Sequence, residues 1–423
     1  MKAHTGLRIN TDRLMMSIEE LGAIGAYRDA EANVMGVRRL ALSAEDGAGR
    51  RLVMRWFEEA GLHVSVDAIG NVYADRAGRD ASLAPVMSGS HVDSVPTGGR
   101  FDGVLGVLGA LEVVRTLNDA GAMTRRPLTI AFFTDEEGCR FGTDMLGSAV
   151  ATGRIPLEQA YALRDADRKS VRNELQAIGF LGDEAVNTRR PHAFVECHVE
   201  QGPLLIHEGI DLGVVSGVQG ISWQRLTISG ASAHAGATPM HLRKDAGLAA
   251  AMINTKIHDM CAHGDYGSDM RATMGVIRPE PCMINVIPGR VVATVDLRNP
   301  SDDAMHRAEH ALDAYCRELE RTMGVTIVSQ QTARTPAVAF DESVQQIIEA
   351  AARTQGLSCR RILAGAGHDA QEWSAVCKTA MIFVPGLNDG ISHNPRELST
   401  PEQCANGINT LLAVVLALSD EVA

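Results

Sequence analysis

The segment Leu128-Thr-Ile-Ala-Phe-Phe133 is almost wholly apolar, and Thr134-Asp-Glu-Glu137 follows it at once. A short apolar run that ends abruptly in polar residues is typical of a buried strand in a parallel sheet, because such strands are covered on both faces. Three further runs of this kind are Ala84–Met87, His192–Val195 and Thr379–Val384. We therefore predict four buried strands of a largely parallel sheet.

Helix-length amphipathic segments lie between these runs, and they include Thr11–Ala26, Arg50–Ala60 and Gly103–Asn118. The alternation of strands and helices predicts an open α/β sheet. Near the end of the chain, Thr400-Pro-Glu-Gln403 combines a capping residue, a proline at the first helical position and a capping-box glutamine. This combination predicts the start of the final helix.

The middle of the chain has a different pattern, with strand-like alternation and helical segments at Trp223–Ser229, Asp245–His258, Arg290–Arg298 and Ser301–Met323. We interpret it as a small α+β insertion. Because 423 residues exceed the size at which one core usually stops growing, two domains are expected. We predict a discontinuous α/β domain of residues 1–215 and 335–423, interrupted by an inserted α+β domain of residues 216–334.

Composition and charge exclude several classes of protein. The 40 basic and 52 acidic residues give a net charge of −12, which repels nucleic-acid phosphates, and no dense basic run compensates for it. Eight cysteines without a C-x-x-C pair are typical of a reducing compartment. The first ten residues lack the apolar segment of a secretory signal, and Leu411–Leu418 is far shorter than the roughly 20 residues that span a bilayer. We expect a soluble cytoplasmic protein without a nucleic-acid or membrane partner.

Side chains that can bind metal ions directly follow the four predicted strands, and in chain order they are His91 with Asp93, Glu136 with Glu137, His198, and His393. A further carboxylate, Asp102, lies in a glycine-rich loop. The carboxyl ends of parallel strands meet at one edge of a sheet, so these residues are expected to lie close together. Imidazole and carboxylate suit zinc, and manganese, cobalt or nickel are possible substitutes. If Asp102 bridges two cations, the set His91, Asp102, Glu137, His198 and His393 supplies three ligands to each of them.

The neighbouring residues Glu136 and Glu137 are expected to do different work. Successive side chains of an extended segment leave the backbone on opposite sides. One glutamate can therefore bind metal while the other stays uncoordinated and accepts a proton from water. Asp93, two residues beyond His91, is placed to accept a hydrogen bond from a ligand imidazole and so to orient it.

Each of these residues taken alone has an ordinary structural explanation. A single histidine among 14 is more often a surface or satisfied core residue than a ligand, and an acidic pair is usually a solvated loop. The joint pattern is more informative, because four clusters with complementary ligand types follow four predicted strands. It favours a metal site.

The inserted region carries further candidates, namely His234, Asn285 and Arg298. Arginine can grip a carboxylate with two N–H groups, and histidine or asparagine can donate a hydrogen bond to a developing oxyanion. The alternative for Arg298 is an ion pair with Asp296 at a domain surface. The residues alone favour this alternative.

Eight stretches make the sequence recognisable, and they are GSHVDSVPTGGRFDGVLGV from Gly89, FTDEEGCRFG from Phe133, HVEQGP from His198, GASAHAGATPMHLRKDA from Gly230, INVIPG from Ile284, DLRNP from Asp296, GAGHDA from Gly365 and SHNPRE from Ser392. The chain resembles the di-zinc aminoacylase/carboxypeptidase-like amidohydrolases. Within them it is most similar to the branch of N-carbamoyl-L-amino acid hydrolase, allantoate amidohydrolase and β-ureidopropionase. One departure is Ala364, where relatives often have serine.

The resemblance implies a role for each matching position. His91, Asp102 and His198 would hold one of two zinc ions per subunit, and Asp102, Glu137 and His393 the other. Glu136 would be the general base, His234 the oxyanion donor and Gln201 a contact of the substrate's amide end, while Asn285 and Arg298 would hold the substrate carboxylate. His368 and Asp369 would either orient the substrate or brace the metal ligands.

The resemblance also implies the activity and the assembly. The expected reaction is hydrolysis of the carbamoyl C–N bond of N-carbamoyl-L-amino acids by a di-zinc-activated water, which gives amino acid, ammonia and carbon dioxide. Allantoate amidohydrolase and β-ureidopropionase are the alternatives, and a non-catalytic binding protein of the same fold is a remote one. The inserted domain is expected to act as a lid and to form a homodimer.

Overall fold

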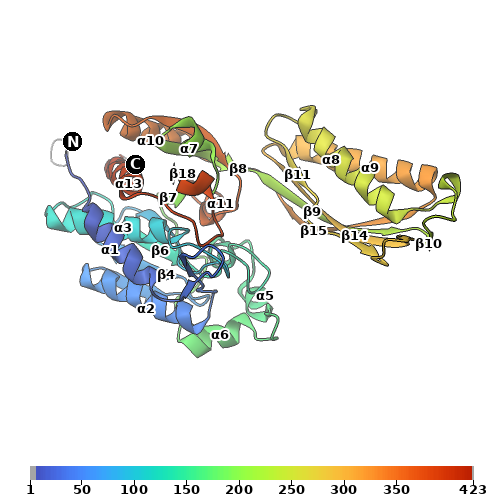
Figure 1. Ribbon diagram of the computed structural model, residues 1–423. Coiled ribbons are helices and arrows are strands. Elements are labelled where there is room, and N and C mark those ends of the chain that lie inside the picture. The colour runs from blue at the N-terminus through green and yellow to red at the C-terminus, as the bar shows by residue number, and fades with distance from the viewer. Residues whose placement is uncertain (1–5, 422–423) are drawn as a thin grey trace. The chain divides into compact units, whose positions relative to one another are not determined.

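The computed structural model describes residues 6–421 (Figure 1), so the first five residues of the N-terminal segment considered above lie outside the described residues. The chain divides into two compact units. The first unit runs to Gly217 and resumes at Ala339, and the second is Val218–Val338. The second unit therefore interrupts the chain of the first.

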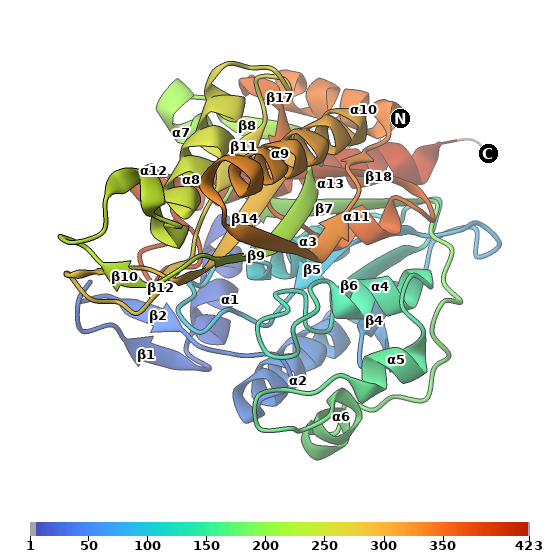
Figure 2. The ribbon, with the colours of Figure 1, turned by 90° about the vertical axis from the view of Figure 1, so that its right-hand side faces the viewer.

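The first unit is built on a sheet that, within residues 6–421, has nine strands in the order β16-β8-β18-β7-β5-β6-β4-β3, with β17 beside β8. Its centre (Figure 2) consists of the parallel strands β18 (Lys378–Val384), β7 (Ala193–Val199), β5 (Val86–His91) and β6 (Leu128–Phe133). The outer strands are β3 (His63–Val66), β4 (Val72–Arg76), β8 (Leu212–Val218), β16 (Val338–Ala339) and β17 (Cys359–Ala364). The mostly parallel sheet is confirmed, although β4 and β8 run antiparallel to β6 and β18.

The predicted ends of two central strands were wrong. β5 continues beyond Met87 to His91, and β7 continues beyond Val195 to Val199. The small residues that follow Met87 remain in the ladder, and Gly89 pairs with Ala131 so closely that a Cβ on Gly89 would lie 1.9 Å from the Ala131 carbonyl oxygen. Small polar residues therefore mark close strand packing here and not the start of a loop.

Helices cover this sheet. The long ones are α1 (Thr11–Gly22), α2 (Ala44–Glu59), α3 (Val104–Asp119), α10 (Glu342–Thr354) and α13 (Pro401–Asp420). The short ones are α4 (Leu146–Thr152), α5 (Leu157–Ala162), α6 (Val171–Ile178), α7 (Leu204–Glu208), α11 (Asp369–Trp373) and α12 (Leu387–Gly390), and a two-stranded ribbon joins β1 (Ala26–Arg28) to β2 (Met35–Val37). α3 packs on β5 and contacts α1 and α13.

Local capping explains where two helices begin. α13 begins with the predicted capping box, in which the Gln403 N–H donates to Thr400 Oγ1 and the Thr400 N–H donates to Gln403 Oε1. α2 begins at Ala44 and not at the predicted Arg50, because Ser43 caps it and accepts the Asp46 N–H. Within the described residues, no helix is both long enough and apolar enough to cross a bilayer.

The second unit is an α+β fold, as expected. Its main sheet contains β9 (Gly220–Ser229), β11 (Arg271–Thr273), β12 (Ile277–Glu280), β14 (Arg290–Asn299) and β15 (Thr326–Thr335), all antiparallel, and a small separate pair is β10 (Ala233–His234) with β13 (Val286–Ile287). Alternate residues of β14 are buried, as the alternating sequence predicts. The helices α8 (Ala246–Ala262) and α9 (Asp302–Met323) lie side by side over this sheet (Figure 1), and the 3₁₀ turn η1 spans Met240–Leu242.

Candidate metal centre

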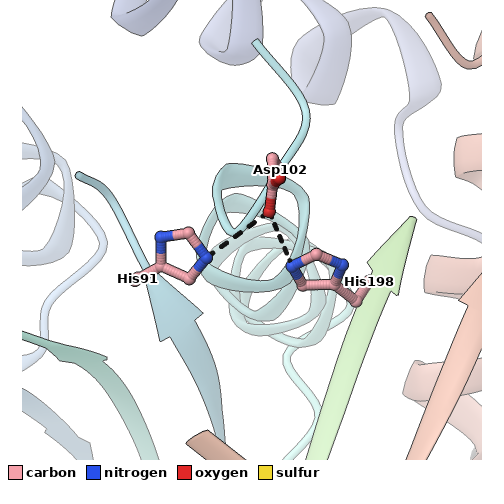
Figure 3. A group of neighbouring side chains, drawn as sticks. All are labelled: His91, Asp102 and His198. Atoms are coloured by element: carbon pink, nitrogen blue, oxygen red, sulfur yellow. Dashed lines mark ion pairs between the residues drawn. The ribbon is translucent and has the colours of Figure 1, made fainter. Parts of the chain in front are cut away.

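Two buried histidines and one aspartate meet at the carboxyl end of the parallel strands. His91 is the last residue of β5, and His198 lies near the end of the neighbouring β7. Asp102 comes from the loop before α3, and the three side chains point toward one another (Figure 3). Oδ1 of Asp102 lies 3.5 Å from Nε2 of His91 and 3.1 Å from Nε2 of His198. These residues form a group that could hold a metal ion.

The other oxygen of Asp102 belongs to a second group. Oδ2 of Asp102 lies 3.4 Å from Nε2 of His393, and Oε2 of Glu137 lies 3.3 Å from the same nitrogen. Asp102, Glu137 and His393 therefore form another set that could hold a metal ion. The two sets share Asp102 and use different oxygens of its carboxylate.

Main-chain carbonyl groups fix the orientation of the buried imidazoles. Nδ1 of His91 lies 3.0 Å from the carbonyl oxygen of Asp93, and Nδ1 of His198 lies 2.9 Å from that of Val199. Nδ1 is then the protonated nitrogen, and Nε2 presents its lone pair to the group. The contact expected from the Asp93 carboxylate comes from its main chain, since Oδ1 is 3.8 Å from the ring and Oδ2 accepts the Glu137 N–H.

The donor set fits a pair of divalent cations. Nε2 of His91 is buried and has no hydrogen-bond partner among the residues the structure describes. Burial raises the pKa of Glu137 to about 8, and the negative charge of Asp102 contributes. Carboxylates facing imidazoles, without a thiolate in either group, suit zinc, manganese or cobalt.

Glu136 stands beside the first group without belonging to it. Its Oε2 lies 3.4 Å from Nε2 of His91, and the side chain is buried. Burial raises its pKa well above the ordinary value, and the negative charges of Asp369 and Glu137 add to this effect. The residue before it, Asp135, has φ 55°, in the left-handed region, so the backbone is not simply extended where the two glutamates diverge. A buried carboxylate next to a metal-binding group can accept and return a proton.

Gln201 also reaches the centre. Its side-chain N–H donates to Oδ2 of Asp102 over 2.9 Å, and the same nitrogen lies 3.4 Å from Nε2 of His393. The glutamine therefore borders the group formed by Asp102, Glu137 and His393.

The other residues singled out from the sequence belong to the second unit. His234 on β10 accepts the N–H groups of Gly236 and Ala237 at Nδ1, which leaves Nε2 as the donor of the neutral ring. The N–H of Ala235, the residue after His234, donates to the carbonyl oxygen of Asn285. The main chains of His234 and Asn285 are therefore close to one another. The guanidinium of Arg298 contacts the carboxylate of Asp296, with Nη2 3.1 Å from Oδ2. This ion pair is the one expected if Arg298 has a structural role and does not hold the substrate carboxylate.

Two further buried residues lie beside the centre, namely Glu397, for which the sequence predicted no role, and His368, for which it left two roles open. The carboxylate of Glu397 accepts the N–H groups of Phe101 and Asp102. The ring of His368 lies 4.5 Å from that of His198, and Glu196, His198 and His368 form a third possible metal-binding group. Burial lowers the pKa of His368 well below its ordinary value, and the His198 ring adds to this effect. The only signal for Glu397 was its place in the stretch that carries His393.

Comparison with known proteins shows the family of the chain. Residues 87–417 match peptidase family M20/M25/M40. The chain is 40% identical to the N-carbamoyl-L-amino-acid amidohydrolase of Rhizobium meliloti over 415 residues. The aligned region covers 98% of each protein. It is 32% identical to a ureidoglycolate hydrolase of Oryza sativa subsp. japonica, over 97% of this chain and 85% of that protein. A solved amidase of the hydantoinase/carbamoylase family from Burkholderia multivorans has TM-score 0.94 and 43% identity, covering 99% of this chain and 100% of that one.

Proposed function

The chain belongs to peptidase family M20/M25/M40 and is a hydrolase of C–N bonds, and on this premise we propose that it hydrolyses the carbamoyl group of N-carbamoyl-L-amino acids. The products are the free amino acid, ammonia and carbon dioxide. The proposal depends on the arrangement of the two candidate metal-binding groups and Glu136. Two candidate metal-binding groups share Asp102, and the uncoordinated carboxylate of Glu136 lies 3.4 Å from a ligand of the first group.

We propose that His91, Asp102 and His198 hold one zinc ion and that Asp102, Glu137 and His393 hold another. The family is metal-dependent, and the donor atoms suit zinc. Bound there, the pair of cations supplies Lewis acidity to the substrate carbonyl and to water, both of which are poorly reactive at neutral pH. Side chains carry out the proton transfer and bind the substrate.

Glu136 moves the proton. It accepts a proton from the attacking water, and it delivers this proton to the nitrogen that leaves the carbamoyl carbon. Its burial suits the first of these steps, because a carboxylate with a raised pKa is a stronger base and takes a proton from water more readily than an exposed one. In this proposal Gln201, which borders the second group, donates its side-chain N–H to the ureido end of the substrate.

The second unit supplies the remaining contacts in this proposal. The protonated Nε2 of His234 donates to the oxyanion that forms when water attacks the carbonyl carbon. Asn285 and Arg298 hold the amino-acid carboxylate. To do so, Arg298 gives up its ion pair with Asp296 and binds the substrate carboxylate instead. In this role the second unit is a lid. The homodimer and the cytoplasmic location expected from the sequence stay predictions.

Ureidoglycolate hydrolysis is a second candidate, because a relative with 32% identity carries that name. Its substrate is also a ureido acid with a carboxylate, so the same residues would serve. Allantoate and N-carbamoyl-β-alanine belong to the same chemical class.

A substrate panel separates these possibilities. The zinc-reconstituted protein is incubated with N-carbamoyl-L-amino acids, their D enantiomers, N-carbamoyl-β-alanine, allantoate, ureidoglycolate and an N-acetyl-L-amino acid. Ammonia and primary amine are measured separately. The proposal predicts the highest kcat/KM for an N-carbamoyl-L-amino acid, with equal release of ammonia and amino acid. A higher kcat/KM for any other compound overturns it.

A further inference from the structure

Glu397 connects the loop of one candidate ligand to the loop of another. It lies in the segment Ser392–Glu397, which follows β18 and also carries His393. Its side chain is buried, and Oε1 accepts the N–H groups of Phe101 and Asp102 over 3.0 and 3.1 Å. The carboxylate therefore fixes the main chain of the residue that both metal-binding groups share.

The second oxygen of Glu397 completes this connection. Oε2 lies 2.7 Å from Oγ of Ser392, which also lies 2.9 Å from Oδ2 of Asp102. A hydroxyl group has one proton to donate, so Ser392 bonds one of these carboxylates at a time. It remains bonded to Glu397 whenever Oδ2 of Asp102 has another partner.

The loop that carries Asp102 is shaped around this carboxylate. A Cβ on Gly99 would lie 2.5 Å from both Cβ and Oε1 of Glu397, so only glycine leaves room for the glutamate in this position. A further contact joins the two loops, since Thr97 Oγ1 donates to the carbonyl oxygen of His393. Hydrogen bonds thus hold backbone atoms of both loops.

His393 is the ligand that most needs such support. Its φ of 53° lies in the left-handed region, which is unfavourable for a residue with a side chain. Its side chain is 51% exposed, whereas His91 and His198 are buried at the ends of central strands. The sheet carries two of the three residues of the first group, whereas all three residues of the second group lie in loops, with Glu137 beyond the end of β6.

We propose that Glu397 is a positioning residue that holds Asp102 and His393 in the mutual arrangement required by the second metal-binding group. The inference rests on the proposed function in one respect, namely that both groups bind cations. Glu397 acts through the main chain of Asp102 and through Ser392. Its loss therefore weakens the group of Asp102, Glu137 and His393 far more than the group of His91, Asp102 and His198.

Zinc titration of the metal-free full-length chain tests this inference, with zinc chloride as the only ligand and competition against a chromophoric chelator as the readout. The wild type is expected to bind two zinc ions. Glu397→Ala is expected to keep one tight site and to weaken the other roughly 10- to 100-fold, the usual effect of removing a group that orients a ligand. Glu397→Gln is expected to stay close to wild type, because an amide oxygen still accepts both N–H groups.

Two further variants separate positioning from general stability. Glu112 is a buried glutamate on α3 that also accepts a main-chain N–H, that of Asn10, together with Arg13. Glu112→Ala should lower Tm and leave both zinc affinities unchanged. Gly99→Ala places a methyl group against Glu397 and should reproduce the selective loss, which keeps the test open if Glu397→Ala does not fold.

Several results overturn the inference. These are two unchanged sites in Glu397→Ala, equal weakening of both sites in that variant, a Glu397→Gln variant that behaves like Glu397→Ala, and a wild type that binds fewer than two zinc ions. Turnover is measured on the same samples. A wild type that binds two zinc ions but does not release ammonia from N-carbamoyl-L-amino acids contradicts the proposed function and leaves the positioning role standing.

Discussion

Glu136 and Glu137 are adjacent in sequence, yet their carboxylates face different histidines. Oε2 of Glu136 lies 3.4 Å from Nε2 of His91, and Oε2 of Glu137 lies 3.3 Å from Nε2 of His393. Only Glu137 belongs to a group of residues that could hold a metal ion. The two glutamates should therefore respond differently to the same substitution.

Glu136→Gln should lower kcat by roughly 10²- to 10⁴-fold, because an amide cannot accept the proton of water. The variant should still bind two zinc ions, as measured by inductively coupled plasma mass spectrometry. Glu137→Gln is the matched change one residue away, and it should lose one equivalent of zinc. A Glu136→Gln variant with near wild-type turnover would remove Glu136 from the role of general base.

Arg298 and Asp296 can be tested as a pair. If Arg298 holds the substrate carboxylate, Arg298→Ala should lower kcat/KM roughly 10- to 150-fold, mainly through KM, because a charge-assisted hydrogen bond contributes about 1.5–3 kcal/mol. Asp296→Asn, which removes the negative charge that now pairs with Arg298, should change KM far less. Equal losses of Tm in both variants, with KM unchanged in both, would mean that the ion pair is purely structural.

Zinc affinity should rise with pH. Burial raises the pKa of Glu137 to about 8, and the hydrogen bond to Asp102 raises the pKa of His393 to about 9. Both groups therefore hold protons at pH 7 in the metal-free chain, and a cation must displace them. Calorimetry in two buffers with different protonation enthalpies should show proton release at pH 7 and tighter binding at pH 8 than at pH 6. Affinity that does not change across this range would count against these residues as ligands.

Removal of metal should destabilise the folded chain. A cation that binds the native state and not the unfolded state adds about 2.7 kcal/mol when its free concentration is 100 times its Kd. Differential scanning calorimetry should show a lower Tm after dialysis against a chelator and recovery on addition of zinc. Asp102→Ala should abolish this difference, because both groups lose a shared ligand. A zinc-dependent Tm that survives this substitution would indicate a metal site elsewhere.

The elements with strong local signals could be predicted from the sequence. The run Leu128–Phe133 is the strand β6 without any change of bounds, and Thr400 opens the final helix through the predicted capping box. The ends of β5 and β7 were missed because Ser, Gly and Cys read as loop residues, whereas their burial in the ladder comes from neighbouring strands that are distant in sequence.

In the candidate site, too, some residues could be predicted from the sequence and others could not. The side-chain types of His91, Asp102 and Glu137 suggested a metal centre, since few other functions require those groups together. Glu397 gave no such signal, because it acts through main-chain N–H groups that every residue carries. The contact between Arg298 and Asp296 lies two residues apart on one strand and could be anticipated.

Anomalous X-ray diffraction can show whether one aspartate binds two cations. Crystals grown with zinc are measured on both sides of the zinc absorption edge. If Asp102 binds both, two anomalous peaks are expected about 3.5–4 Å apart, each about 2.0–2.2 Å from a different oxygen of Asp102. A single peak, or peaks that do not touch Asp102, would contradict this proposal.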